Sequence, residues 1–253
     1  MRWAAPWTRW EAAEMLEFAD VDFQFRRGSG VSDLSFHVDP GEVVAVIGLN
    51  GAGKTTLMRL ALGMLRPDAG SVRLFGALIA DASAASWALV GALIEVPLAY
   101  PELTVEENLR ISCRLHGGDP ARVEAALDTW KLTSLAGRRF RRLSLGNRQR
   151  TGLAAALQHH PKMIVLDEPS NALDPASVIM LRKELALRAK HGAAILVSSH
   201  HLDEVARVAD RVLLMNRGRL LGQLDTTGAD LERAFFDRIA EDDERYDHIG
   251  QEP

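Results

Sequence analysis

The sequence predicts an α/β fold with a nucleotide-binding core, and three observations support this prediction. Val43–Ile47 is a five-residue apolar run, which fits a strand buried on both faces. The stretch 48–55 fits the pattern G-x-x-x-x-G-K-[ST], and apolar residues follow it at helical spacing. Two more short apolar runs, Met163–Leu166 and Ala193–Ser198, flank a helical stretch at Pro175–Lys190. Strands, a phosphate loop and helices in this order indicate a P-loop NTPase core.

The phosphate loop has the residue types that a nucleotide site needs. Its glycines allow a tight turn whose amides face inward toward an anion, and the helix that follows adds its positive N-terminal end. We expect Lys54 to reach the β- and γ-phosphates of ATP, and the Thr55 hydroxyl to ligate Mg²⁺. The predicted nucleotide contacts of this loop are Gly48, Asn50, Gly51, Ala52, Gly53, Lys54, Thr55 and Thr56.

Two adjacent acids follow the apolar run at Met163–Leu166. An acid at the end of a strand, here Asp167, can hold Mg²⁺ as in other P-loop enzymes. Side chains alternate along a strand, so we expect Glu168 to point elsewhere and to act as the base that polarises the attacking water.

Further elements surround this core. Two alternating stretches, Glu17–Phe25 and Val31–Val38, precede it and predict antiparallel strands, and Ser71–Phe75 predicts another short strand. From about 96 to 150 the pattern is helical, with a capping box that starts at Thr104. The chain therefore reads as a core with an antiparallel β sub-domain and an inserted helical sub-domain.

Length and composition exclude several classes. A chain of 253 residues with 47% hydrophobic and 25% charged residues is an ordinary composition for a soluble globular protein. The single cysteine, Cys113, excludes an intramolecular disulfide framework and a zinc site built on several thiolates. No apolar run approaches the length of a membrane span, so we expect the chain not to cross a membrane by itself.

Charge is distributed unevenly along the chain. Residues 110–150 carry ten Lys and Arg against three acids, and residues 230–253 carry nine acids against three Arg. A basic segment can mark nucleic acid, lipid headgroups or bound phosphates, but it is equally typical of a solvated helical face. We expect the acidic tail after Glu241 to be disordered.

The N-terminal residues 1–14 allow two interpretations. Trp3, Trp7 and Trp10 would share one face of a helix, which is typical of a segment lying on a bilayer. Alternatively, translation starts at Met15 and the preceding residues form a loose extension, which the interruption at Pro6 favours.

Several further motifs together resemble those of the ABC-type ATPases. LSLGNRQR at Leu143–Arg150 is similar to the family's LSGGQ signature, and SNALD at Ser170–Asp174 is similar to its D-loop. VSSH ends at His200, like the family's switch histidine, and Phe25 stands where the family stacks an aromatic ring on adenine. The resemblance covers about Leu16 to Leu224 and implies a RecA-like core in the ABC ATPase fold.

The resemblance implies a site shared by two copies of the chain. In this family two ATPase domains pair head to tail, so that each ATP lies between one P-loop and the partner's signature. Ser144 and Gly146 would then contact the nucleotide just before a helix predicted at Arg148–Leu157. Asp174 would cross the dimer interface. His200 would bond the γ-phosphate and, with Glu168, hold the attacking water.

Three positions depart from the family pattern. Leu145 stands in place of the first glycine of the signature, where it cannot take glycine's conformations freely, and Asn147 stands in place of glutamine. Glu95 occupies the place of the Q-loop glutamine. Its carboxylate can still ligate Mg²⁺, but it adds negative charge near the triphosphate.

These departures resemble the ATP-binding subunits of bacterial exporters of the bacitracin-resistance and multidrug type. That resemblance implies a homodimer on the cytoplasmic face of the cell membrane, bound through Glu95–Arg114 to a permease that is a separate polypeptide. We expect the ATPase domain at 15–227, and a C-terminal helix and acidic tail at 228–253. The alternative is a soluble ABC ATPase that acts on nucleic acid, but the 90 positions between Lys54 and Ser144 leave no room for a long coiled coil, and we expect no nucleic-acid partner.

Overall fold

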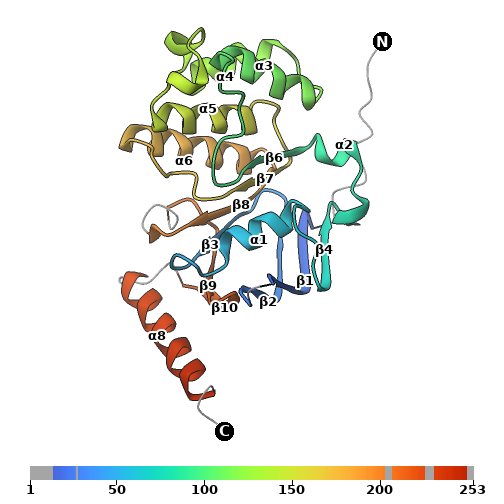
Figure 1. Ribbon diagram of the computed structural model, residues 1–253, viewed down its shortest axis with the longest axis vertical. Coiled ribbons are helices and arrows are strands. Elements are labelled where there is room, and N and C mark those ends of the chain that lie inside the picture. The colour runs from blue at the N-terminus through green and yellow to red at the C-terminus, as the bar shows by residue number, and fades with distance from the viewer. Residues whose placement is uncertain (1–13, 27, 203–206, 226–230, 250–253) are drawn as a thin grey trace.

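The computed structural model describes residues 14–26, 28–202, 207–225 and 231–249. The predicted N-terminal extension and its tryptophans lie outside these ranges. Figure 1 shows two sheets beneath a group of helices, with the last helix projecting from the opposite end. This mixed α/β architecture agrees with the fold class that the sequence predicts.

The first sheet is antiparallel and has the strand order β2-β1-β4-β5. Its strands are β1 (Leu16–Gln24), β2 (Gly30–Val38), β4 (Ala69–Leu74) and β5 (Ala77–Leu78). Leu16 on β1 pairs with Val38 on β2 and with Leu74 on β4, so β1 is central. The antiparallel strands predicted before the phosphate loop are confirmed.

The second sheet has the strand order β10-β9-β3-β8-β7-β6. Its strands are β3 (Val43–Ile47), β6 (Val90–Leu93), β7 (Met163–Leu166), β8 (Ala194–Ser199), β9 (Arg211–Asn216) and β10 (Arg219–Leu224). All neighbouring pairs are parallel except β9 and β10, which form a hairpin. The carboxyl ends of the parallel strands therefore meet at one edge, where ligands of such sheets bind.

Strand β3 joins the two hydrophobic cores. All five of its residues are buried. Val43, Ala45 and Ile47 pack into the core that the large helices cover, whereas Val44 and Val46 pack into the core shared with the antiparallel sheet and helix α1. Side chains alternate along a strand, so a strand that packs against a core on both faces needs an apolar residue at every position.

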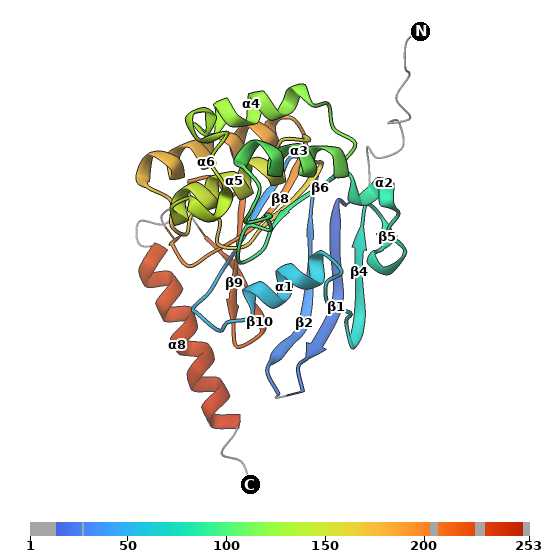
Figure 2. The same ribbon diagram turned by 45° about the horizontal axis from the view of Figure 1, so that its top comes forward.

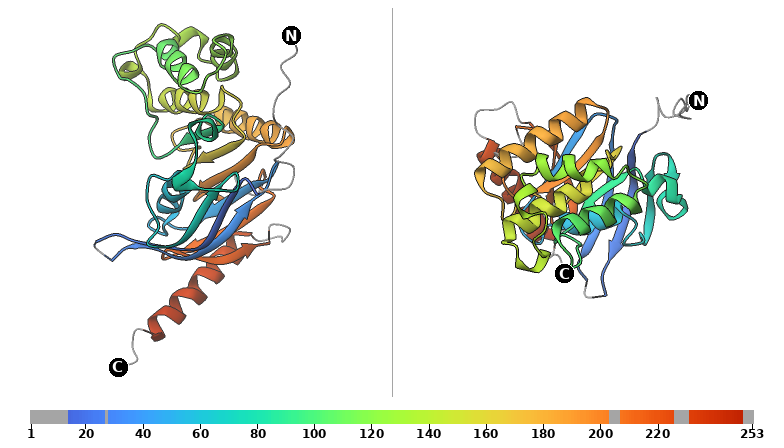
Figure 3. Two further views of the ribbon diagram at one scale, coloured as in Figure 1. Left: turned by 90° about the vertical axis from the view of Figure 1, so that its right-hand side faces the viewer. Right: turned by 90° about the horizontal axis from the view of Figure 1, so that it is seen from above.

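The helices are α1 (Lys54–Ala61), α2 (Ala84–Trp87), α3 (Val105–Leu115), α4 (Ala121–Thr129), α5 (Leu145–Leu157), α6 (Pro175–Lys190) and α8 (Leu231–Ile249). Helices α3, α4 and α5 gather at one end of the molecule, away from α8 (Figure 3). The predicted capping box is confirmed, because Thr104 and Glu107 bond each other's backbone at the start of α3. Among the described residues, no helix is long and apolar enough to span a membrane.

The acidic C-terminal segment is helical. The expectation that it would be disordered after Glu241 is wrong for residues 242–249, because α8 continues to Ile249, and residues 250–253 lie outside the described ranges. Phe235 and Ile239 anchor the helix in the core, and Asp242 and Asp243 find polar partners at the β9–β10 hairpin. The basic partners and the apolar anchor offset the like-charge repulsion that the composition indicates.

Candidate nucleotide-binding site

The phosphate loop lies between β3 and α1, as the sequence predicts. Gly51 and Gly53 adopt left-handed backbone angles, with φ of 86° and 105°. Gly48 is required for a different reason, because a Cβ there would lie 2.3 Å from the backbone oxygen of Met215. Asn50 and Gly51 are exposed, whereas Ala52 is buried beneath them. The loop therefore exposes backbone at its tip and packs tightly at its base.

Lys54 is the buried cation of this site, and its residue is 6% exposed. Its Nζ donates hydrogen bonds to the backbone oxygens of Gly48 at 2.7 Å and Leu49 at 3.3 Å. The same Nζ lies 3.2 Å from Oε1 of Glu168. The lysine is thus held across the mouth of the loop by one ion pair and two carbonyls.

Asp167 follows β7 and joins three elements. Its Oδ2 accepts a hydrogen bond from the Thr55 hydroxyl at 2.8 Å, and its Oδ1 accepts one from the Ser198 hydroxyl at 2.6 Å. The Ser198 oxygen in turn accepts from the backbone amide of Glu168 at 2.8 Å. Sequence reasoning missed Ser198, although its place at the end of a buried strand, two residues before His200, is the signal that could have identified it. Thr56 is the next residue on α1 and is half-buried.

Glu168 faces away from Asp167, but not for the reason that strand alternation suggests. Strand β7 ends at Leu166, and Glu168 has a left-handed backbone with φ of 48°. This turn directs its carboxylate to Lys54 and to His200, whose Nδ1 lies 2.7 Å from Oε2. The His200 amide also donates to Oε2 at 3.3 Å. Backbone strain in a non-glycine residue is often found at functional sites.

Glu95 is held by a different partner from the one expected. Its Oε1 lies 2.8 Å from Nη2 of Arg59, which is one helical turn beyond Thr55 on α1. In the described structure, no hydrogen bond joins Glu95 to Thr55 or Asp167. Glu95 also has a left-handed backbone, with φ of 58°. Arg59 therefore neutralises the negative charge that this position adds.

Phe25 lies at the turn between β1 and β2. Its ring is in edge contact with the ring of Phe23, with 4.7 Å between the centroids. The residue is 36% exposed, so part of the ring is available to another planar group.

The signature residues lie at the start of α5. Ser144 is the N-cap and accepts a hydrogen bond from the amide of Asn147 at 3.4 Å. The helix begins at Leu145 rather than at the predicted Arg148, because this cap sets its first turn. Leu145 is therefore an ordinary helical residue that needs no glycine conformation, and its side chain is 70% exposed.

Gly146 brings the signature against the D-loop. A Cβ at this position would lie 2.7 Å from the backbone oxygen of Ala172. Asp174 ends the D-loop as the N-cap of α6 and accepts from the Ser177 amide at 2.7 Å. This hydrogen bond holds the pKa of the Asp174 carboxyl below its ordinary value. Ser144, Gly146 and Asp174 thus form a second group, and no hydrogen bond joins them to the phosphate loop in the described part of the chain.

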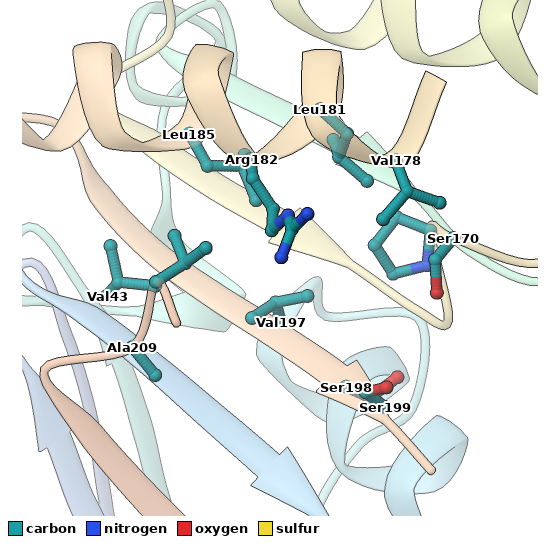
Figure 4. Close-up of a pocket in the computed structure, with 12 residues that line it drawn as sticks. Val43, Ser170, Val178, Leu181, Arg182, Leu185, Val197, Ser198, Ser199 and Ala209 are labelled. Carbon is teal, nitrogen blue, oxygen red and sulfur yellow. The ribbon is translucent and has the colours of Figure 1, made fainter. Parts of the chain in front are cut away.

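A small pocket lies between α6 and the face of the parallel sheet (Figure 4). Its lining is mostly apolar, with Val43, Val178, Leu181 and Val197 among the residues that Figure 4 labels. Arg182 is the one cation among the lining residues, and a single guanidinium in a mostly apolar wall offers a triphosphate few partners. The polar cluster around Lys54 suits a triphosphate better, because it combines a cation, the backbone amides of the phosphate loop and a helix N-terminus.

Residues that could hold a divalent cation are few. The described residues contain no group of three or more His, Cys, Asp and Glu side chains that could hold a metal ion. The Thr55 hydroxyl and the Asp167 carboxylate are hard oxygen donors 2.8 Å apart. This pair fits Mg²⁺, which typically takes one or two protein ligands together with phosphate oxygens.

The fold and this arrangement define an ABC-type ATPase. Residues 31–171 match the family described as ABC transporter, which is more than half of the chain. The chain belongs to the ABC transporter family, and the expectation of an ATPase with this fold is confirmed.

Two relatives of known name are ATP-binding proteins of transport or export systems. Bacitracin transport ATP-binding protein BcrA from Enterococcus faecalis is 37% identical over 213 residues, which cover 83% of this chain and 69% of the relative. Nod factor export ATP-binding protein I from Paraburkholderia xenovorans (strain LB400) is 35% identical over 212 residues, 82% of this chain and 70% of the relative.

Two solved structures of ABC transporter ATP-binding proteins share the fold of this chain. A structure described as the ATP-binding subunit of an ABC transporter has a TM-score of 0.82 and 29% identity, and the match covers 88% of this chain and 99% of that one. A nucleotide-free ATP-binding cassette from an ABC transporter has a TM-score of 0.74 and 25% identity, covering 90% and 98%.

Proposed function

We propose that this chain is the ATP-hydrolysing subunit of an exporter, in which two copies pair head to tail and drive a separate membrane permease. One observation carries the proposal: Lys54, Glu168 and His200 form one connected polar cluster beside the phosphate loop. The Thr55–Asp167 pair lies in the same place in the fold, where β3 and β7 end.

The cluster supports a mechanism in which ATP releases the base. Before ATP binds, Lys54 shares its charge between two carbonyls and Glu168. The β- and γ-phosphates are stronger partners for the ammonium group, so their arrival frees one oxygen of Glu168. That oxygen then accepts a proton from the water that attacks the γ-phosphate, while His200 keeps the carboxylate in place through the other oxygen.

Mg²⁺ fits beside this cluster. Thr55 and Asp167 would hold it, with Ser198 fixing the orientation of the carboxylate. When bound, Mg²⁺ neutralises charge that develops on the phosphate oxygens. Glu95 would join this set only after leaving Arg59.

A second copy would complete the site. Ser144 and the Gly146 amide stand at the positive end of α5, which attracts a phosphate group, and nothing within the described chain covers the exposed Leu145 beside them. Asp174 lies next to this surface and would face the partner copy. Phe25 would stack on adenine.

The permease would dock on the segment after β6. Val96, Leu98 and Tyr100 expose 65%, 93% and 59% of their surfaces. Apolar side chains exposed in succession are typical of a protein interface. Within the expected surface Glu95–Arg114, this stretch is the part best suited to a hydrophobic partner. By similarity to the bacitracin and Nod factor relatives, we propose a cargo that is exported across the cell membrane, with this subunit on the cytoplasmic face.

The division of the chain follows from these roles. We propose an ATPase domain at 15–227 with a helical sub-domain at about 96–150, followed by a C-terminal element at 228–253. Within the basic segment, Arg110 pairs with Glu106 and Arg141 pairs with Glu102. These pairs favour a solvated helical face over nucleic acid as the reason for the charge excess.

The test of the proposed function is Glu168→Gln. Turnover is expected to fall by about 10²–10⁴-fold because the amide cannot accept the proton, while ATP binding is retained. Size-exclusion chromatography with ATP should show a stable dimer of the variant. Glu184→Gln is the matched control, because Glu184 pairs with Arg188 on α6. Parental turnover in the Glu168 variant would refute the general-base role.

A further inference from the structure

The turn between β9 and β10 supports the base of the phosphate loop. Its Gly218 amide donates to the backbone oxygen of Ala52 at 2.8 Å, and its Gly218 oxygen accepts from the Ser32 amide at 2.9 Å. Just before the turn, the Met215 carbonyl approaches Gly48 so closely that no Cβ fits between them. A shift of this turn would therefore move the phosphate loop.

The turn has a conformation that requires support. Arg217 and Gly218 have positive φ angles of 45° and 80°, as in the two-residue hairpins whose first position favours Asn, Asp or Gly. Arginine at this position is strained, and such residues persist where the surroundings hold them.

Helix α8 supplies that support through two adjacent carboxylates. Asp242 and Asp243 accept hydrogen bonds from the Asn216 amide group at 3.0 and 2.9 Å. Asp243 also pairs with Nε of Arg217 at 2.9 Å, and Asp242 pairs with Nη2 of Arg219 at 2.9 Å. Figure 2 shows α8 running beside β9 and β10. The helix thus bonds three of the four residues of the turn.

We propose that Asp242 and Asp243 are positioning residues for the phosphate loop, so that the C-terminal helix sets the affinity of the site for ATP. This inference rests on the proposed function, because it requires that the loop binds ATP. The coupling passes from α8 to the turn by side-chain bonds, and from the turn to Ala52 by a backbone bond.

A rival effect has the opposite sign. The two carboxylates also neutralise Arg217 and Arg219 near the site of a triphosphate. If charge alone mattered, removal of the carboxylates would make the surroundings of the site more positive and would raise the affinity for ATP.

The experiment compares two double variants of the full chain. Asp242→Asn with Asp243→Asn removes the bonds to the turn, and Asp237→Asn with Glu244→Gln removes the same charge from exposed positions of the same helix. The readouts are the Kd of a fluorescent ATP analogue, the KM for ATP and kcat. We expect Kd and KM to rise about tenfold in the first variant, with kcat at saturating ATP unchanged and the control within about twofold of the parent.

The outcomes separate the inference from the proposed function. A parent that fails to bind ATP refutes the proposed function itself. A parent that binds, with a first variant of equal or higher affinity, overturns the positioning role, and so does an equal loss in the control. Exchanging the charges, Asp243→Lys with Arg217→Asp, restores the ion pair but not the hydrogen bond from Asn216, because lysine cannot accept it. Since aspartate tolerates the left-handed turn, the exchange is expected to return Kd part of the way from the value of Asp243→Lys alone to the parental value. Failure of that exchange to recover affinity would also overturn the inference.

Discussion

The P-loop half and the signature half of the proposed site differ in how their polar groups are used. In the P-loop half, Lys54 pairs with Glu168, and Asp167 accepts hydrogen bonds from Thr55 and Ser198, which come from other elements. In the signature half, Ser144 and Asp174 each cap a helix within three residues of their own position. One half is held by tertiary contacts between strand ends, and the other by local structure at two helix starts.

This difference indicates which half can bind ATP without a second copy of the chain. A network that already pairs a cation with carboxylates is ready to exchange those partners for a nucleotide and a metal ion. Two capped helix starts beside an exposed leucine have stable shapes but lack a ligand of their own. We therefore expect changes in the P-loop half to alter ATP binding by a single copy, and changes in the signature half to alter turnover alone.

The largest effect on ATP binding should come from Lys54→Ala. Loss of the ammonium group removes a charge-assisted bond to phosphate, so ATP affinity is expected to fall by about 10- to 150-fold. Equilibrium binding of a fluorescent ATP analogue measures this directly. Lys183→Ala serves as a control, since Lys183 is an exposed lysine on α6. An unchanged Kd for Lys54→Ala would contradict the expectation that the P-loop half binds ATP in a single copy.

Gly146→Ala should separate binding from turnover. The added Cβ would lie 2.7 Å from the Ala172 oxygen, so the signature or the D-loop must shift. We expect turnover to fall about tenfold while the Kd of one copy for ATP stays within twofold. Gly137→Ala is the matched control, because a Cβ there meets nothing within 4 Å. A weaker Kd in Gly146→Ala would show that the signature already acts within one copy.

The ion pair of Glu95 with Arg59 lies at the segment between β6 and α3, which leads from the parallel sheet to the helical sub-domain. Their ion pair is partly exposed, so removing it should cost less than about 1 kcal/mol of stability. Arg59→Ala leaves a free carboxylate near the triphosphate and is expected to weaken ATP binding by about threefold at low salt. Glu95→Gln alone should have little effect on ATP affinity, and the double variant Arg59→Ala with Glu95→Gln should recover the parental affinity. Without that recovery, Arg59 would have a role apart from neutralising Glu95.

The smallest effect concerns the far end of α5, which begins at the signature. The pKa of His159 is lowered to about 4, mainly by burial and in smaller part by the neighbouring His116. Arg122 and Arg188 also oppose its protonation. The unfolded chain binds the proton more readily below about pH 6.5, so stability falls on acidification toward pH 4.

Between pH 7.5 and pH 6 this single group should cost roughly 0.8 kcal/mol of unfolding free energy. Urea denaturation at the two pH values measures the change, and His159→Gln should make it smaller by that amount. An equal pH dependence in this variant would assign the effect to other groups.

Much of the P-loop half could be predicted from the sequence. Its loop, lysine and acid pair follow apolar strands in register, and parallel strands bring their carboxyl ends together whatever the details of packing. The sequence predicts the start of α5 three residues too late, because the signal of Ser144 as a cap is weaker than the apolar periodicity after it. The helical acidic segment is not predictable from local sequence, because its partners, Asn216, Arg217 and Arg219, are more than twenty residues away along the chain.

The sequence by itself therefore determined the fold class, the family and the residues around the phosphate loop, because these depend on local patterns of apolar spacing and short motifs. The tertiary structure decided which charges neutralise one another: Glu168 with Lys54 and His200, Glu95 with Arg59, and Asp243 with Arg217. Ion pairs depend on distances across the fold, and spacing along the chain does not fix those distances.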